Sequence, residues 1–273
     1  MSFSFTFTLD IGDKKVNIRE LSFIEYKNIC KQLFNQTDVT KIKKVFNDIL
    51  NTCVLNKVTL NIYEKIVTLL FIRGLTLGKD VSLQLENKKI TFNTDLLLQK
   101  LSNDTKPFDV HHNNLVYKVG LPYNFILSEN DIIKGVCESL ISIDTGEKMI
   151  YLSSLNDEEK LQVISFLPGL PITEIYKKIY NNYKDISFNI PNIENINFDL
   201  FNASFIFFLK FIFDENFNTV LSLEYNLRRH LNFNMYDLEK TSYPEAKIML
   251  NKFSDEMKES LKNNSSGNIN LPQ

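Results

Sequence analysis

Residues 3–27, FSFTFTLDIGDKKVNIRELSFIEYK, decide how the chain begins to fold. Polar and apolar residues alternate in this stretch, Gly12 and Asp13 supply turn residues, and the alternation then resumes. A period of two on both sides of a glycine-containing turn is the pattern of a β-hairpin. Ser22 followed by Glu25 forms a capping box, so a helix is expected to follow the hairpin directly.

Outward from this stretch, the two periods mark the other elements. Helical spacing marks residues 22–34, 40–54, 60–75, 94–101, 128–136, 158–167, 171–183, 202–213, 218–231, 235–241 and 244–262. Period-two alternation marks residues 81–85, 90–92, 108–110, 115–119, 139–143 and 149–152. The predicted fold class is therefore α+β, with N-terminal β-hairpins and helices and a mostly helical C-terminal half.

The change of period also predicts a division of the chain. We expect an α+β domain with antiparallel hairpins over residues 1–153 and a mostly helical region over residues 154–262. Residues 263–273 are polar and are expected to form a flexible tail.

The composition limits the classes of function. Among 273 residues, 31 Lys and Arg stand against 33 Asp and Glu, a net charge of −2. Proteins that bind nucleic acid through many phosphate contacts carry a basic excess, so that class is disfavoured. Cys30, Cys53 and Cys137 are widely spaced, which predicts buried thiols in a reducing compartment. The start of the chain has no signal-peptide pattern, and the most apolar stretch, 203–213, is too short to span a bilayer.

No residue pattern supports catalysis or a bound cofactor. The histidines are His111, His112 and His230, and no Cys or acidic pair stands at metal-ligand spacing from them. Neither a Gly-x-Ser-x-Gly motif nor a phosphate-binding loop is present. The acidic run at 157–159 opens a predicted helix, where negative charge offsets the helix dipole. We therefore predict a protein that is not an enzyme and that has no metal and no cofactor.

An ordered series of short segments is more informative than these motifs. Its members are Lys15-Val-Asn-Ile-Arg-Glu-Leu-Ser-Phe-Ile-Glu-Tyr-Lys27, Leu60-Asn-Ile-Tyr-Glu-Lys, Phe71-Ile-Arg-Gly74, Leu221-Ser-Leu-Glu-Tyr225, Asp237-Leu-Glu239 and Tyr243-Pro-Glu245. Their order resembles the baseplate hub subunits and hub-assembly proteins of T-even-type contractile-tailed phages, over about residues 10–260. In that family a short hairpin leads through a basic residue into a helix rich in Glu and Lys.

The resemblance implies a non-enzymatic phage tail protein, either a baseplate hub component or a factor that assembles the hub and tail. Its partners would be other tail proteins, namely the central hub or the tape-measure protein. It would contact no membrane, and neither nucleic acid nor a small molecule would be its main ligand. It would be found in the host cytoplasm during assembly and in the baseplate of the virion tail.

The first strand is one candidate interaction site, because the edge of a strand offers unpaired backbone groups to a partner strand. Its residues are Ser4, Phe5, Thr6, Phe7 and Thr8. We expect the phenylalanines at positions 3, 5 and 7 to face a core while the edge stays available.

Arg228 and Arg229, followed by His230, form the other candidate site. Near a helix C-terminus these residues offset the helix dipole, and they could also contact phosphate. Together with Lys41-Ile-Lys-Lys44 they support an alternative function, a nucleic-acid-associated accessory protein of a phage or an AT-rich bacterium.

Overall fold

The computed structural model describes residues 5–85, 88–95, 106–126, 129–152, 155–165, 171–183, 201–215 and 217–265. The strands are β1 (Thr6–Ile11), β2 (Lys14–Arg19), β3 (Asp80–Leu85), β4 (Lys88–Asn93), β5 (Phe108–His112), β6 (Leu115–Val119), β7 (Leu140–Asp144) and β8 (Met149–Tyr151). The helices are α1 (Phe23–Leu33), α2 (Val39–Cys53), α3 (Ile62–Leu77), α5 (Glu129–Ser139), α6 (Asp157–Ser165), α7 (Ile172–Tyr183), α8 (Ala203–Phe213), α9 (Phe217–Leu231), α10 (Met235–Lys240) and α11 (Tyr243–Ser265). The fold is α+β, as the sequence predicts.

The N-terminal hairpin and its helix form where the sequence places them. β1 and β2 pair antiparallel, with Ile11 opposite Lys14. Gly12 takes a φ of 60° in the turn between them, a conformation that glycine adopts without steric cost. Ser22 then caps α1, and the Glu25 side chain accepts the Ser22 amide in return, so the capping box is complete.

The strands of the middle third form a separate hairpin and a small sheet. β3 pairs with β4, and β5, β6, β7 and β8 form a four-stranded antiparallel sheet in that order. The turn between β5 and β6 is Asn113-Asn114, with φ values of 49° and 61°. Asn tolerates this left-handed region, whereas His111 and His112 belong to β5 itself.

Some helices begin one residue away from the position expected from the sequence. In these helices a short polar side chain caps the first turn at a position that the apolar periodicity does not mark. α2 begins at Val39, since the Asp38 carboxylate accepts the amides of Thr40 and Lys41. Asn156 exchanges side-chain and amide hydrogen bonds with Glu159 at the start of α6, which begins at Asp157. The helix expected at 94–101 lies beyond the described residues after Asp95.

One hydrophobic core joins early and late parts of the chain. α8 contributes six buried apolar residues, which confirms its interpretation as a buried helix. The ring centroids of Phe46 on α2 and Phe213 on α8 lie 5.7 Å apart, and those of Tyr26 on α1 and Tyr243 on α11 lie 4.4 Å apart. All three cysteines are buried and unpaired, as expected.

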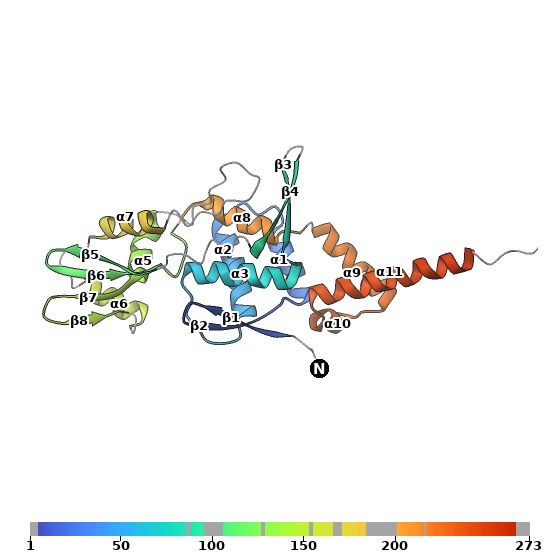
Figure 1. The fold of residues 1–273 in the computed structure, drawn as a ribbon, viewed down its shortest axis with the longest axis horizontal. Coiled ribbons are helices and arrows are strands. Elements are labelled where there is room, and N and C mark those ends of the chain that lie inside the picture. The colour runs from blue at the N-terminus through green and yellow to red at the C-terminus, as the bar shows by residue number, and fades with distance from the viewer. Residues whose placement is uncertain are drawn as a thin grey trace, which may run out of the picture.

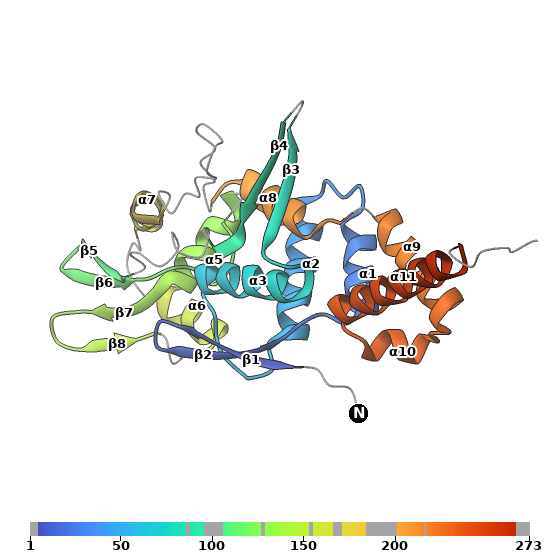
Figure 2. The same cartoon turned by 45° about the vertical axis from the view of Figure 1, so that its right-hand side comes forward.

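Figures 1 and 2 show an elongated arrangement of these elements. The hairpin β1–β2 lies in the middle with α1, α2, α3 and α8, and the hairpin β3–β4 projects from this central part. The four-stranded sheet with α5, α6 and α7 forms one end, and α9, α10 and α11 form the other. Two exposed regions, the N-terminal hairpin and the helical end, therefore lie in different parts of the molecule.

Candidate interaction surfaces

The described residues contain no cluster of three or more His, Cys, Asp or Glu side chains that could hold a metal ion. His112 lies 3.6 Å from the Glu174 carboxylate (Nδ1 to Oε2), and His230 stacks on Phe253 with ring centroids 5.3 Å apart. Burial raises the pKa of Cys30 to about 11 and that of Cys53 to about 12, so both remain neutral thiols at pH 7. In the part of the chain that the structure describes, no helix combines the length and apolar character needed to cross a bilayer.

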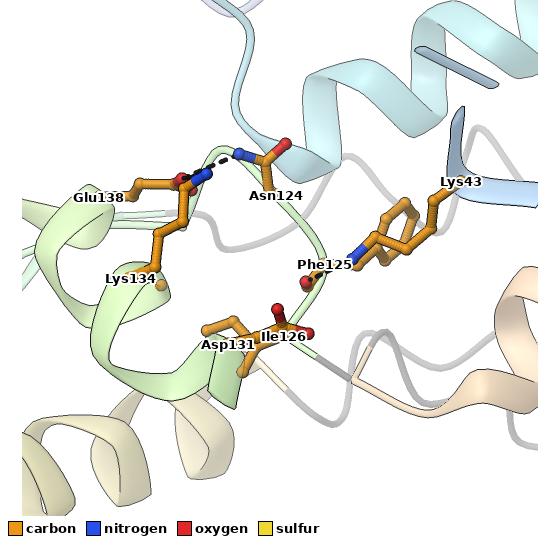
Figure 3. A pocket seen from close by; sticks show the side chains of 8 residues that line it. Lys43, Asn124, Phe125, Ile126, Asp131, Lys134 and Glu138 are labelled. Carbon is orange, nitrogen blue, oxygen red and sulfur yellow. Dashed lines mark hydrogen bonds and ion pairs between the residues drawn. The ribbon is translucent and has the colours of Figure 1, made fainter. Parts of the chain in front are cut away.

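A hollow of about 210 Å³ lies between α2, α5 and the segment that precedes α5 (Figure 3). Lys43 donates to the carbonyl of Phe125 (3.1 Å), and Asn124 donates to the Glu138 carboxylate (2.9 Å). Lys134 lies 3.9 Å from the same carboxylate. Small-molecule sites usually measure about 300–1,000 Å³, and these polar groups already bind one another. The residues that line the hollow therefore connect α2 and α5 through the segment before α5, and the hollow offers little room for a ligand.

The hydrogen bonds of β2 show which backbone groups of the N-terminal hairpin face outward. Asn17 donates its amide to the Asn56 side chain (2.8 Å) and accepts the Leu55 amide at its carbonyl (2.8 Å). Both backbone groups of Asn17 therefore point away from β1. Along an antiparallel pair of strands, hydrogen-bonded residue pairs alternate with pairs whose backbone groups do not bond each other and point outward. Thr8, which is opposite Asn17, consequently directs its amide and carbonyl away from β2.

The same alternation directs the backbone groups of Thr6 and Asp10 outward, so the hairpin has one open edge. No hydrogen bond joins the backbone of Thr6, Thr8 or Asp10 to a residue outside the hairpin within the described ranges. The edge of β2 is closed instead, because the Asn56 side chain also donates to the carbonyl of Lys15 (2.8 Å). We call the backbone groups of residues 6, 8 and 10 the open edge of β1.

The predicted residues of the first strand have different environments. Ser4 lies outside the described residues, Thr6 and Thr8 are exposed, and Phe7 packs partly buried against the core. Phe5 was expected to face the core but is 62% exposed, because it precedes the first strand pair at Thr6 and Arg19. Phe5 therefore adds apolar surface beside the open edge of β1.

Arg228 and Arg229 lie in the last turn of α9 and bind different neighbours. The Arg228 guanidinium is 3.0 Å from the Glu224 carboxylate, and Arg229 donates to the hydroxyl of Tyr225. Lys41 pairs with Asp38, whereas Arg228 pairs with Glu224. Among the described residues, no ion pair or hydrogen bond therefore links the two arginines to the Lys41–Lys44 run. Tyr225 and Tyr236 are not among the interaction residues predicted from the sequence, although each stands four residues before a cation on an exposed helix, a spacing that brings side chains together.

The first segment that carried the family resemblance holds elements together. Arg19 binds the Glu25 carboxylate with both terminal nitrogens (2.8 and 2.7 Å). Burial alone would raise the pKa of Glu25, but the hydrogen bonds from Arg19 and the Ser22 amide outweigh it and lower the pKa. Tyr26 donates to the carbonyl of Phe213 at the end of α8 (3.0 Å). The segment therefore fastens the hairpin to α1, and α1 to α8.

Arg73, in the segment Phe71–Gly74, also holds separate elements together. Its Nε donates to the carbonyl of Ile212 (3.1 Å) and its Nη2 to that of Asp80 (3.0 Å). Its Nη1 donates to the carbonyl of Gly78, and burial lowers the pKa of the guanidinium. Since all three acceptors belong to the protein backbone, Arg73 is committed to the fold and is not a free anion-binding group.

Comparison with known proteins identifies a family. A protein-family model described as T4 bacteriophage base plate protein matches residues 2–197. No curated protein and no solved structure matches the chain.

Proposed function

The chain belongs to the T4 bacteriophage base plate protein family, and from that premise we propose a baseplate hub component or hub-assembly factor that acts by protein–protein contacts. Membership makes it a structural protein of the phage baseplate that works with other baseplate proteins. The proposed partners are the central hub protein and the tape-measure protein. We propose that the chain binds these partners in the host cytoplasm during assembly and is then found in the baseplate of the virion tail.

The open edge of β1 is the observation that carries this proposal. Strand addition uses backbone amides and carbonyls that alternate along one edge, and residues 6, 8 and 10 supply such a row. Proteins usually cover or charge such an edge, and the β2 edge is covered here by Leu55 and Asn56. In a baseplate protein, such an open edge can bind an extended segment of a neighbouring tail protein as an additional strand. The exposed Phe5 side chain would supply an apolar contact beside that strand.

Co-purification of the full-length chain with the hub and tape-measure proteins of the same genome tests the proposal. Thr6→Pro removes an outward amide without touching a β1–β2 hydrogen bond, and we expect binding about tenfold weaker. Thr6→Ala is the matched control, because it removes the side chain and keeps the amide. Thermal unfolding of each variant separates lost binding from a lost hairpin.

Equal binding by Thr6→Pro and the wild type, at equal stability, would exclude strand addition at this edge. Failure of the wild type to bind any tail protein would contradict the hub assignment as well. Tight DNA binding that weakens steeply with salt, in that case, would favour the nucleic-acid alternative.

A further inference from the structure

α9 and α10 are neighbours at the helical end of the molecule (Figures 1 and 2). We name the aromatic, cationic and methionine side chains on their exposed faces the α9–α10 surface. Its residues are Tyr225, Arg228, Arg229, Met235, Tyr236 and Lys240. The exposed fractions are 56% for Tyr225, 48% for Met235 and 60% for Tyr236. Helical spacing places the α9 members opposite the buried residues of that helix. The Arg228 guanidinium lies 3.4 Å from the Met235 sulfur, which joins the two helices into one surface.

Two cations of this surface lie on aromatic rings and not on carboxylates. The Arg229 Cζ atom is 5.6 Å from the ring centroid of Tyr225, and the Lys240 Nζ atom is 3.7 Å from that of Tyr236. Neither cation forms an ion pair with a carboxylate of the described residues. Their charges therefore remain available to an incoming anionic group.

The third cation, Arg228, has only a shared partner. The Glu224 carboxylate lies 3.0 Å from Arg228 and 2.5 Å from Lys27 on α1. One carboxylate is thus shared by two cations, so the charge of Arg228 is only partly neutralised. An acidic group can bind there by charge complementarity.

We propose that the α9–α10 surface is a docking site for an acidic segment of a partner protein, in which Asp or Glu alternates with apolar side chains. Exposed Tyr, Arg and Met are the residue types enriched at protein interfaces. Carboxylates would bind the guanidinium and ammonium groups, and apolar side chains would cover Met235 and the tyrosine rings. This site is separate from the open edge of β1 and does not depend on it.

A protein segment fits the surface better than a nucleic acid does. Asp237 and Glu239 on α10 lie beside the cations in sequence, and a continuous phosphate backbone would pass close to these carboxylates. A nucleic-acid site also needs a row of cations, because each phosphate neutralised adds to affinity. Discrete carboxylates on a peptide can be positioned to avoid the acidic side chains.

The test uses the full-length chain and fluorescein-labelled peptides that tile the baseplate and tail proteins of the same genome. Fluorescence polarisation measures binding, and labelled single- and double-stranded DNA serve as the competing probes. We expect acidic, apolar-containing peptides to bind, and expect the double variant Arg229→Glu, Lys240→Glu to weaken binding about tenfold or more. Tyr236→Ala should also weaken it, whereas Tyr151→Ala, at a 62% exposed tyrosine on β8, should not.

Three results would overturn the proposal. Selected peptides could be neutral or basic, the charge-reversal variant could bind as the wild type does, or DNA could bind at this surface in preference to every peptide. Circular dichroism of each variant confirms that a loss of binding is not a loss of structure. Since Thr6→Pro leaves this surface intact, it should not change peptide binding, so failure here is distinguishable from failure at the open edge of β1.

Discussion

Arg73 donates to three backbone carbonyls, of Ile212, Gly78 and Asp80, and it forms no ion pair within the described residues. The first two carbonyls stand at the ends of α8 and α3, where a positive charge also offsets the helix dipoles. A buried cation is stable only when its donors are occupied, and these carbonyls occupy them. One side chain thus holds the ends of two helices and the start of β3 together.

We predict that Arg73→Lys destabilises the protein by about 3 kcal/mol, because a lysine cannot reach three carbonyls from one ammonium group. Chemical denaturation measures the free energy of unfolding. Arg229→Lys is the matched control at an exposed site, and its effect should stay within about 0.5 kcal/mol. Similar effects of the two substitutions would show that the Arg73 hydrogen bonds contribute little.

At the scale of single elements, two helical glycines have opposite surroundings. A Cβ atom on Gly135 of α5 would lie 2.2 Å from Cδ1 of the buried Ile126 side chain. A Cβ atom on Gly74 of α3 would meet only Lys79 Cγ, at an ordinary 3.6 Å. Gly135 is therefore required for the close approach of α5 to the preceding segment, whereas Gly74 is not required for packing.

The expected result is that Gly74→Ala stabilises the protein by about 0.5–1 kcal/mol, since alanine loses less backbone entropy in a helix. Gly135→Ala should destabilise it by about 1–3 kcal/mol, because Ile126 must leave its position. Urea denaturation of both variants compares the same substitution in two helices. If Gly135→Ala were as stable as Gly74→Ala, the contact between α5 and Ile126 would be looser than the structure indicates.

At the scale of the whole molecule, aromatic contacts cross the predicted division at residue 153. The ring of Phe213 packs against that of Phe46 at an interplanar angle of 58°, and Tyr243 lies against Tyr26 and Phe23. Tyr243 also donates to Glu215, and burial raises its pKa. The division into domains at residues 1–153 and 154–262 stays a prediction. These contacts indicate that the central and C-terminal helices share one hydrophobic core.

Phe213→Ala should therefore cost about 3–5 kcal/mol and lower the stability of both parts of the chain together. Far-ultraviolet circular dichroism follows the helices, and near-ultraviolet circular dichroism follows the packed tyrosines. We expect the two signals to change in one transition, shifted equally by the substitution. Two separate transitions, only one of them shifted, would mean that the segments fold independently.

The sequence by itself determined the local elements and the family. The hairpin of residues 6–19, the Ser22–Glu25 capping box and the Asn113-Asn114 turn depend on residues only a few positions apart. Interactions of that range leave a regular pattern in the sequence, so they can be predicted from it. The order of the short segments also indicated the phage baseplate family, which the family match confirms.

Only the tertiary structure decided which surfaces remain free. The β2 edge is closed by Asn56, 39 residues from Asn17, and this contact leaves the edge of β1 as the open one. The acceptor of the Arg73 Nε lies 139 residues away, and Arg228 and Arg229 are adjacent in sequence but bind different neighbours. Periodicity shows that a residue is on a face, but its partner depends on how distant segments pack, and that packing is a property of the complete fold.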